Sequence, residues 1–273
     1  MQCGVEAEAT KYGLTVTTQA PTQFDPVLQT PIVNAAIAKK PDAMLIAPTD
    51  ATALYPPLLQ AKNSGVIIGL VDTTLNDPSV AVTSVSTDNE AGGAAAADAL
   101  AALINETGTV LVIPFKDGVS TSDQRTKGFV DGIKKYPGIT MLTPQSADKT
   151  PAKATAIVAA ALAAHPDLAG IFATNQDVAE GAATAIRQAS KAGEIQVVGF
   201  DAGAVQVKAL QDGTVQALVA QQPYAIGVQA IDQIVVALTG GTPETYVGTK
   251  TFTLTKDNLS SDEAQAAIYK TNC

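Results

Sequence analysis

Short apolar segments alternate with longer amphipathic segments along most of the chain. The apolar segments are short and rich in Val and Ile, which is typical of strands in a parallel sheet covered on both faces. They are Leu14–Thr18, Ala43–Ala47, Val66–Val71, Val82–Val85, Val110–Pro114, Gly170–Ala173, Gln196–Phe200 and Ala217–Ala220. The Ala-rich segments with helical periodicity are Pro26–Lys39, Thr52–Ser64, Ala91–Ile104, Gln124–Lys135, Ala152–Ala164, Val178–Ala192, Val205–Asp212 and Ala225–Leu238. This βαβα order predicts a doubly wound α/β architecture.

Short polar residues stand directly after six of these predicted strands. They are Pro48-Thr49-Asp50, Asp72-Thr73-Thr74, Thr87-Asp88-Asn89, Thr174-Asn175, Asp201 and Gln221-Gln222. Ligands of open parallel sheets bind beyond the carboxyl ends of the strands, so we expect these side chains to line a hydrogen-bonding pocket. For any single position, capping of the following helix explains the residue equally well. The set as a whole favours the pocket.

Length and charge narrow the class of protein. With 273 residues, the chain is longer than one compact core usually holds, which indicates two lobes. The 17 Lys and Arg residues against 26 Asp and Glu give a net charge of −9, and no basic cluster is present. Because a duplex-binding protein needs a basic face, we expect no nucleic acid partner.

Catalytic and metal-binding motifs are missing from the sequence. The chain has one histidine, His165, and two cysteines at its ends, so no zinc site of ordinary spacing can be assembled. There is no Gly-x-Ser-x-Gly elbow and no phosphate-binding Gly-Lys-Ser/Thr loop. The Gly92-Gly93 pair is better explained by close helix packing than by a dinucleotide site. We therefore predict a protein without a cofactor or metal and without enzymatic activity.

Two cysteines lie almost at the two ends of the chain. Cys3 and Cys273 are either two unrelated thiols or a disulfide that ties the C-terminal tail to the first helix. In the chain-entropy model a loop of this length stabilises the fold by roughly 5 kcal/mol. Such a bond persists only in an oxidising compartment.

The N-terminus reads as a helix rather than as a targeting segment. Residues Met1 to Gly13 mix Glu6, Glu8 and Lys11 into a helical pattern, unlike a signal peptide. No apolar run approaches the roughly 20 residues that span a bilayer. A secreted form of the protein would therefore be seen here as mature chain, or as a fragment of it.

Six segments of the chain, in this order and at these spacings, resemble the type I periplasmic binding proteins of the ribose/galactose class, the solute receptors of ABC transporters. They are Lys40–Asp50 (KPDAMLIAPTD), Ser86–Gly93 (STDNEAGG), Gln124–Phe129 (QRTKGF), Ala164–Asp167 (AHPD), Val197–Asp201 (VVGFD) and Ala220–Pro223 (AQQP). The resemblance covers nearly the whole chain. It implies two similar doubly wound lobes, joined by three crossings that form a hinge, with a ligand held between the lobes.

The resemblance also implies where the lobes begin and end. The crossings would fall near Thr87–Asn89, Gln221–Pro223 and Tyr246–Lys250. Residues 1–87 and 223–247 would form the N-terminal lobe. Residues 88–222 and 248–273 would form the C-terminal lobe and tail.

By the same resemblance, a small sugar or polyol would be held by residues of both lobes and of the hinge. The first lobe would contribute Asp72 and Thr87, the second Arg125, Asn175 and Asp201, and the hinge Gln221. Ionised Asp accepts hydrogen bonds from hydroxyls, Arg donates a fork, and Asn and Gln do both, which suits a polyhydroxylated ligand. Since the chain has no Trp, Phe200 is the best candidate for apolar contact with a sugar face.

The sequence departs from the family pattern at two places. It begins inside the first helix, so the strand that normally precedes this helix, and the aromatic residues of the loop after that strand, are missing. This indicates a truncated chain, a misplaced start, or preceding residues that this sequence does not include. Where a relative places an aromatic residue in the second lobe, this chain has Lys149, which slightly favours a linear polyol or small sugar over a bulky pyranose.

These features predict the substrate-binding component of an ABC importer. Such a protein would act as a monomer in the periplasm or outside the cell, where an N-terminal lipid beyond this chain is one form of attachment, and would dock on a membrane permease. The alternative is the effector-binding core of a LacI-type transcription regulator, which has the same fold. A sugar-modifying enzyme ranks last because no nucleophile or metal cluster is present.

Overall fold

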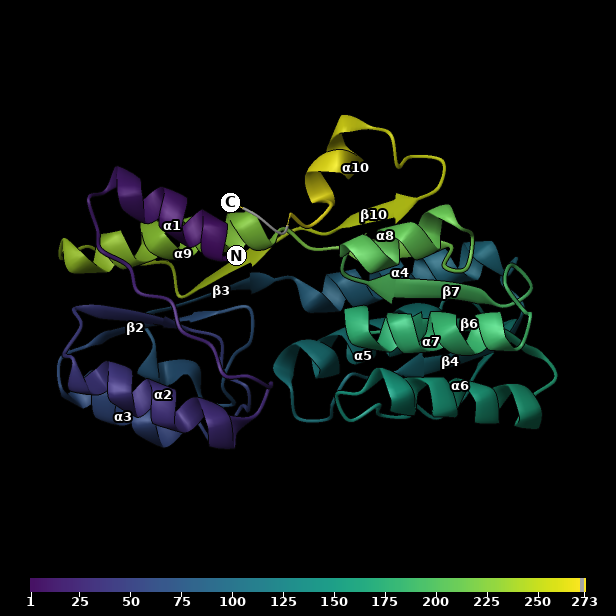
Figure 1. Ribbon diagram of the computed structural model, residues 1–273, viewed down its shortest axis with the longest axis horizontal. Helices are drawn as coiled ribbons and strands as arrows, with labels where there is room; N and C mark the ends of the chain where they lie inside the picture. Colours follow the sequence, from purple (N-terminus) through teal and green to yellow (C-terminus); the bar gives the residue numbers. More distant parts are fainter. Residues whose placement is uncertain (271–272) are drawn as a thin grey trace.

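The computed structural model describes residues 1–270 and 273 and consists of two α/β lobes side by side along the long axis (Figure 1). In chain order the elements are α1 (Gln2–Lys11), α2 (Pro26–Ala38), β1 (Ala43–Ile46), α3 (Tyr55–Asn63), β2 (Ile67–Val71), the 3₁₀ helix η1 (Pro78–Val80), β3 (Thr83–Thr87), α4 (Asn89–Leu103), β4 (Gly108–Ile113), α5 (Ser120–Ile133), β5 (Ile139–Met141), α6 (Pro151–Ala164), β6 (Leu168–Ala173), α7 (Gln176–Gln188), β7 (Gln196–Phe200), α8 (Ala204–Gln211), β8 (Ala217–Ala220), α9 (Pro223–Leu238), β9 (Tyr246–Thr249), β10 (Phe252–Thr255) and α10 (Asp262–Ala267).

The N-terminal lobe is built on a parallel sheet with strand order β1-β2-β3-β9. Helices α1 and α9 lie on one face of this sheet, and α2 and α3 lie on the other (Figure 1). Leu54, Leu58, Ile68 and Leu70 are almost fully buried in the layer beneath α3. The strands are buried because helices cover both faces.

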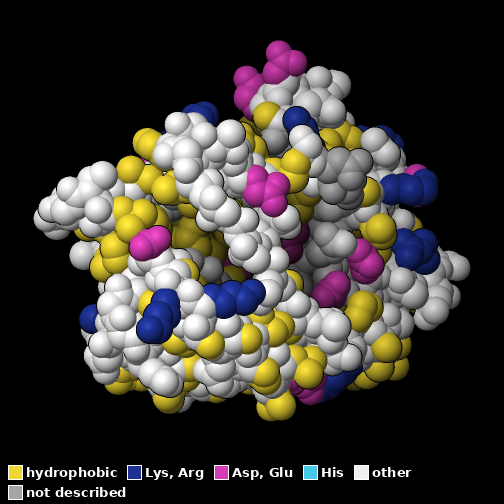
Figure 2. Space-filling model, turned by 60° about the vertical axis from the view of Figure 1, so that its left-hand side comes forward, with side chains coloured by type: hydrophobic (Ala, Val, Ile, Leu, Met, Phe, Trp, Pro, Cys, Tyr) yellow, Lys and Arg dark blue, Asp and Glu magenta, His cyan; other side chains and the backbone are white. Residues whose placement is uncertain are grey.

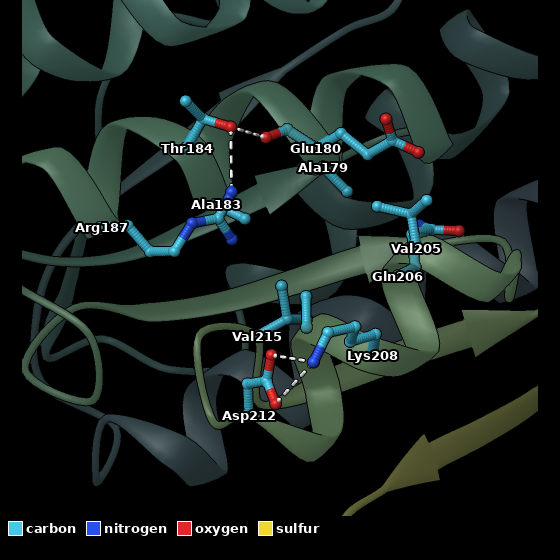
Figure 3. A pocket seen from close by; sticks show the side chains of 11 residues that line it. Ala179, Glu180, Ala183, Thr184, Arg187, Val205, Gln206, Lys208, Asp212 and Val215 are labelled. Carbon is cyan, nitrogen blue, oxygen red and sulfur yellow. Dashed lines mark hydrogen bonds and ion pairs between the residues drawn. The ribbon is translucent and has the colours of Figure 1, made fainter.

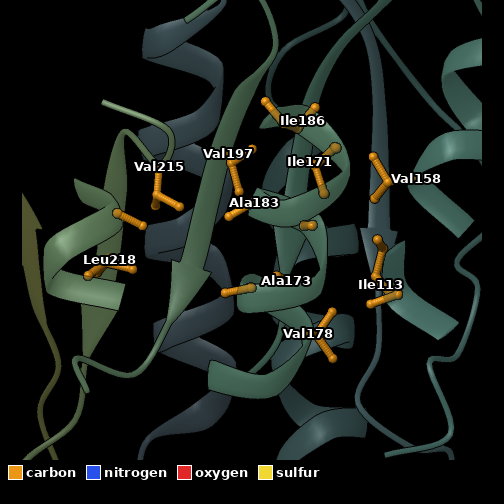
Figure 4. Close-up of a cluster of buried hydrophobic side chains, with 14 of the residues drawn as sticks. Ile113, Val158, Ile171, Ala173, Val178, Ala183, Ile186, Val197, Val215 and Leu218 are labelled. Atoms are coloured by element: carbon orange, nitrogen blue, oxygen red, sulfur yellow. The ribbon is translucent and has the colours of Figure 1, made fainter. Parts of the chain in front are cut away.

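The C-terminal lobe is built on a six-stranded sheet with order β10-β8-β7-β6-β4-β5, in which only β10 is antiparallel to its neighbour. Alternate residues of one strand enter different cores. Val110 and Val112 of β4 pack with α4 and α5, whereas Leu111 and Ile113 pack with the core beneath α6 and α7. Figure 4 shows the second core. This period of two with both faces buried explains why the strand reads as a continuous apolar run.

Seven of the eight predicted strands and all eight predicted helices are confirmed, with ends that differ by a few residues. The prediction of a strand at Leu14–Thr18 is wrong, because this segment is irregular and mostly exposed. A strand needs a hydrogen-bonded neighbour, and within the described residues β1 is an edge strand that pairs only with β2.

The chain passes between the two sheets three times. β3 belongs to the first sheet and the helix after it, α4, packs on the second, so one passage lies at Thr87–Asn89. The passage from β8 to α9 lies at Gln221–Pro223, and the passage from β9 to β10 lies between Thr249 and Phe252. Three adjacent connections form a hinge.

Cys3 and Cys273 form a disulfide with a Cα–Cα distance of 5.2 Å, which confirms the predicted bond. Cys3 lies on α1, which packs against α9 of the N-terminal lobe. The C-terminal tail, here residues 256–273, contains α10, which buries Ala264 and Ala267 in the core of the other lobe. The disulfide therefore links the two lobes. Among the described residues no helix is both long and apolar enough for a membrane span.

Candidate ligand-binding site

Two aspartates occupy equivalent positions in the two lobes. Asp72 follows β2 and Asp201 follows β7, and their φ angles are 62° and 80°. Each backbone N–H donates to the next strand, from Asp72 to the Val85 carbonyl and from Asp201 to the Val219 carbonyl, both at 2.9 Å. Left-handed backbone is uncommon outside glycine and concentrates at binding sites. Each lobe thus places one aspartate, with this unusual backbone conformation, at the carboxyl edge of its sheet.

The Asp72 carboxylate has no hydrogen-bond donor among residues 1–270 and 273. Burial raises the pKa of Asp72 above the ordinary carboxyl value, whereas the Arg125 guanidinium lowers it and the Asp201 carboxylate raises it further. The charges of Arg125 and Asp201, both in the second lobe, therefore lie close enough to Asp72 to act on its pKa. Asp72 offers an acceptor there that the protein itself does not satisfy.

Arg125 is held rigidly on α5 and is only 4% exposed. Its Nε donates to Asn89 Oδ1 at 2.8 Å, and its Nη1 donates to the Thr174 carbonyl at 2.8 Å. The guanidinium lies 3.8 Å from the centroid of the Phe200 ring, a cation–π arrangement. Phe200 is fully buried, so its ring supports Arg125 rather than facing solvent.

Close packing of α4 and α5 positions Arg125. A Cβ on Gly93 would lie 2.1 Å from the Arg125 carbonyl oxygen, and one on Gly128 would lie 2.0 Å from the Glu90 carbonyl oxygen. The two helices therefore touch through their backbones, and only glycine allows this approach. The packing role expected for Gly93 fits this contact.

A hydrogen-bond chain connects the hinge to Asp201. Thr87 Oγ1 donates to Gln221 Oε1 at 2.6 Å, and Gln221 Nε2 donates to Asp201 Oδ1 at 2.5 Å. Thr87 and Gln221 are both buried. Thr87 and Gln221, which belong to two separate crossings, are thus in direct contact beside Asp201 of the C-terminal lobe.

Tyr269, in the tail, is a member of this cluster that sequence reasoning missed. Its hydroxyl donates to Asp201 Oδ1 at 2.9 Å and accepts from the Gln221 backbone N–H at 3.4 Å. Burial, and then the Asp201 charge, raise the pKa of Tyr269 well above its ordinary value, so the hydroxyl remains a donor at neutral pH. A single Tyr beyond the matching segments carries no sequence signal for this role.

Asn175 has a capping role. It is the N-cap of α7, and its Oδ1 accepts from the Val178 N–H at 3.0 Å. Asp50, after β1, behaves similarly, because its carboxylate accepts from Thr52 and Ala53 N–H groups and these bonds lower its pKa. For these two strand ends the local capping explanation describes the observed contacts.

The lobes also touch outside the three crossings. The Thr74 N–H donates to Ser120 Oγ at 2.9 Å. Lys149, the lysine noted in the sequence, forms an ion pair with Asp25 of the other lobe, with 3.3 Å between Nζ and Oδ2. Phe24 and Phe115 meet edge to face, with ring centroids 6.0 Å apart.

Other surface features do not join this cluster. Among residues 1–270 and 273, no group of three His, Cys, Asp or Glu side chains is arranged to hold a metal ion. A groove between α7 and α8 contains the Lys208–Asp212 ion pair and shares no residue with the cluster (Figure 3). On the face in Figure 2, Lys and Arg are interspersed with Asp and Glu rather than gathered by sign.

Comparison with known proteins places this geometry in a family. The family model described as "Periplasmic binding protein domain" matches residues 1–242. The D-ribose/D-allose-binding protein of Pseudomonas aeruginosa is 33% identical over 230 residues, which cover 81% of this chain and 71% of that protein. The ribose import binding protein RbsB of Bacillus subtilis is 33% identical over 229 residues, covering 84% and 73%.

A solved structure is similar over almost the full length. It is an ABC transporter solute binding protein from Agrobacterium vitis bound with α-D-tagatopyranose, with 38% identity, a TM-score of 0.96, and coverage of 98% of this chain and 93% of that one. The two-lobed fold, the hinge of three crossings and the matching family model all agree. The chain belongs to the periplasmic binding protein family, with its type I fold.

Proposed function

We propose that this protein is the substrate-binding component of an ABC importer and captures a small sugar between its lobes. The observation that carries the proposal is the half-buried Asp72 carboxylate, whose pKa responds to the charges of Arg125 and Asp201 and which accepts no hydrogen bond from the described residues. A half-buried carboxylate that accepts no hydrogen bond from the protein is free to accept one from a ligand hydroxyl.

The cluster suits a monosaccharide. Asp72 from one lobe and Asp201 from the other would accept hydrogen bonds from sugar hydroxyls, Arg125 would donate from a fixed position, and Asn175 and Gln221 would add amide groups. Phe200 acts through Arg125. The relatives named above bind ribose, allose or tagatopyranose by their names, so we place pentoses and hexoses first and polyols second.

Binding would act through the hinge. A ligand that bridges Asp72 and Asp201 favours the arrangement in which both lobes hold it. We assign residues 1–87 and 223–247 to the N-terminal lobe and residues 88–222 and 248–273 to the C-terminal lobe. We also propose that the protein works as a monomer in the periplasm, delivers its ligand to a membrane permease, and has no catalytic activity of its own.

The regulator alternative gains no support from the comparisons. The relatives reported above carry names of sugar-binding or import-binding proteins. The disulfide also favours an oxidising compartment over the cytosolic setting of a transcription regulator.

A thermal-shift screen against D-tagatose, D-ribose, D-allose, other pentoses and hexoses, and linear polyols tests the proposal. At a sugar concentration about 100 times Kd, binding stabilises the native state by about 2.7 kcal/mol, which raises Tm by roughly 5–10 °C. Asp201→Ala and Arg125→Ala should abolish the shift while unfolding remains cooperative. If no compound raises Tm, the proposed function fails, and if either variant binds as the wild type does, the assigned site is wrong.

A further inference from the structure

The C-terminal tail enters the sugar site from outside both sheets. Tyr269 is fixed by its backbone as well as its side chain, since its N–H donates to the Ala202 carbonyl at 3.0 Å. Leu259, Ile268 and the ring of Tyr269 pack against the core of the C-terminal lobe. Tyr269 therefore reaches Asp201 from an anchored segment, directly beside the loop that carries this aspartate.

The hydrogen bonds to Asp201 leave it little freedom. Its Oδ1 accepts from Tyr269 Oη and from Gln221 Nε2, and its Oδ2 accepts from the Gln176 N–H at 3.0 Å. A carboxylate has about four lone-pair sites, so three protein donors leave about one for a ligand hydroxyl. The orientation of the carboxylate, and hence the direction of the remaining site, depends on all three donors.

We propose that Tyr269 is a positioning residue for sugar binding. Its hydroxyl fixes the Asp201 carboxylate so that the remaining lone pair faces the cleft, and the tail is thereby part of the binding site. This inference rests on the proposed function, because Asp201 is the group through which Tyr269 acts. Gln221 shares the task, since Tyr269 Oη also accepts its backbone N–H.

The Cys3–Cys273 disulfide supports this arrangement. It attaches the end of the tail, four residues after Tyr269, to α1 of the N-terminal lobe. The tail is thus held on one side by the packing of α10 and on the other by a covalent bond. A short segment fixed at both ends loses less conformational freedom when its side chain forms a hydrogen bond.

The test compares Tyr269→Phe with Tyr136→Phe. Tyr136 Oη also donates to a carboxylate, Asp98 Oδ1 at 3.0 Å, but on the surface of the C-terminal lobe, so it is a matched control. Titration calorimetry with the sugar that gives the largest thermal shift should show Kd weakened roughly 10-fold or more in Tyr269→Phe, because the lost bond goes to a charged group. Tyr136→Phe should retain the wild-type Kd.

An Asp201→Asn background separates positioning from a general effect on the fold. Asn keeps a carbonyl acceptor, so binding remains measurable at high sugar concentration. In this background Tyr269→Phe should change Kd by less than about 3-fold, since the charge-assisted bond is already gone. An equal loss in both backgrounds means that Tyr269 acts independently of Asp201 and overturns the proposal.

The remaining outcomes are also distinct. Wild-type affinity in Tyr269→Phe overturns the positioning role while leaving sugar binding intact. A second outcome is weaker binding together with a loss of unfolding free energy in ligand-free Tyr269→Phe that far exceeds the loss in Tyr136→Phe. This outcome assigns Tyr269 to stability alone and also overturns the positioning role. If the wild type binds no sugar, the proposed function falls and this inference with it.

Discussion

Asp72→Asn should separate sugar binding from stability. Burial raises the pKa of Asp72, so the folded state disfavours its charged form. The stability that this group contributes is present below its unfolded pKa, about 3.9, and is lost as the pH rises through its raised folded pKa. Asn has nearly the same shape and does not titrate. The ligand-free variant should therefore be more stable than the wild type at neutral pH.

The magnitudes follow from the unpartnered carboxylate. Removal of a partly desolvated charge that has no protein donor is expected to add about 1 kcal/mol to the unfolding free energy, which raises Tm by roughly 2–4 °C for a protein of this size. Binding should weaken. If the carboxylate accepts from two sugar hydroxyls, its loss costs about 2–4 kcal/mol, or roughly 30- to 700-fold in Kd.

Calorimetry on the ligand-free protein at pH 7 and below pH 4, with a sugar titration at pH 7, measures both effects. Asp42→Asn is the control, because Asp42 is an exposed aspartate of the same lobe. The gain in Tm from Asp72→Asn should disappear at the lower pH, where the wild-type carboxyl is also neutral. A variant that is less stable than the wild type at pH 7, or that remains more stable below pH 4, would refute the account of Asp72 as a partly desolvated charge without a protein donor.

Two further predictions concern stability and packing. Replacing both Cys3 and Cys273 with Ser should lower the unfolding free energy, measured in urea, by about 5 kcal/mol in the chain-entropy model, and a loss below about 1 kcal/mol would contradict it. Gly93→Ala should cost about 1–3 kcal/mol and weaken sugar binding, because the new methyl group would meet the Arg125 carbonyl oxygen and push α4 from α5. Unchanged Kd and Tm in this variant would show that the helices absorb the methyl group.

Much of the fold could be predicted because its signals are local. A strand such as β4 is apolar throughout since both its faces are covered, and that composition is visible in the sequence. Leu14–Thr18 has a similar local pattern but no neighbouring strand, and pairing depends on residues far away in the chain. β5, β9 and β10 were not predicted because they are only three or four residues long and largely half-exposed.

The candidate site divides in the same way. Asp72 and Asp201 stand at strand ends, where the parallel-sheet rule directs attention, and the structure gives both the same unusual backbone. Asn175 meets the same rule, yet its contact in the structure is the helix cap. Tyr269 and the Phe24–Phe115 pair could not be predicted, because their roles arise only when distant segments fold together.

The Cys3–Cys273 bond closes a covalent ring that contains residues 3–273. A single protease cut at an exposed loop within this ring gives two fragments that stay covalently connected until the disulfide is reduced. In a nicked sample, one band without reductant and two bands with it would reveal the ring.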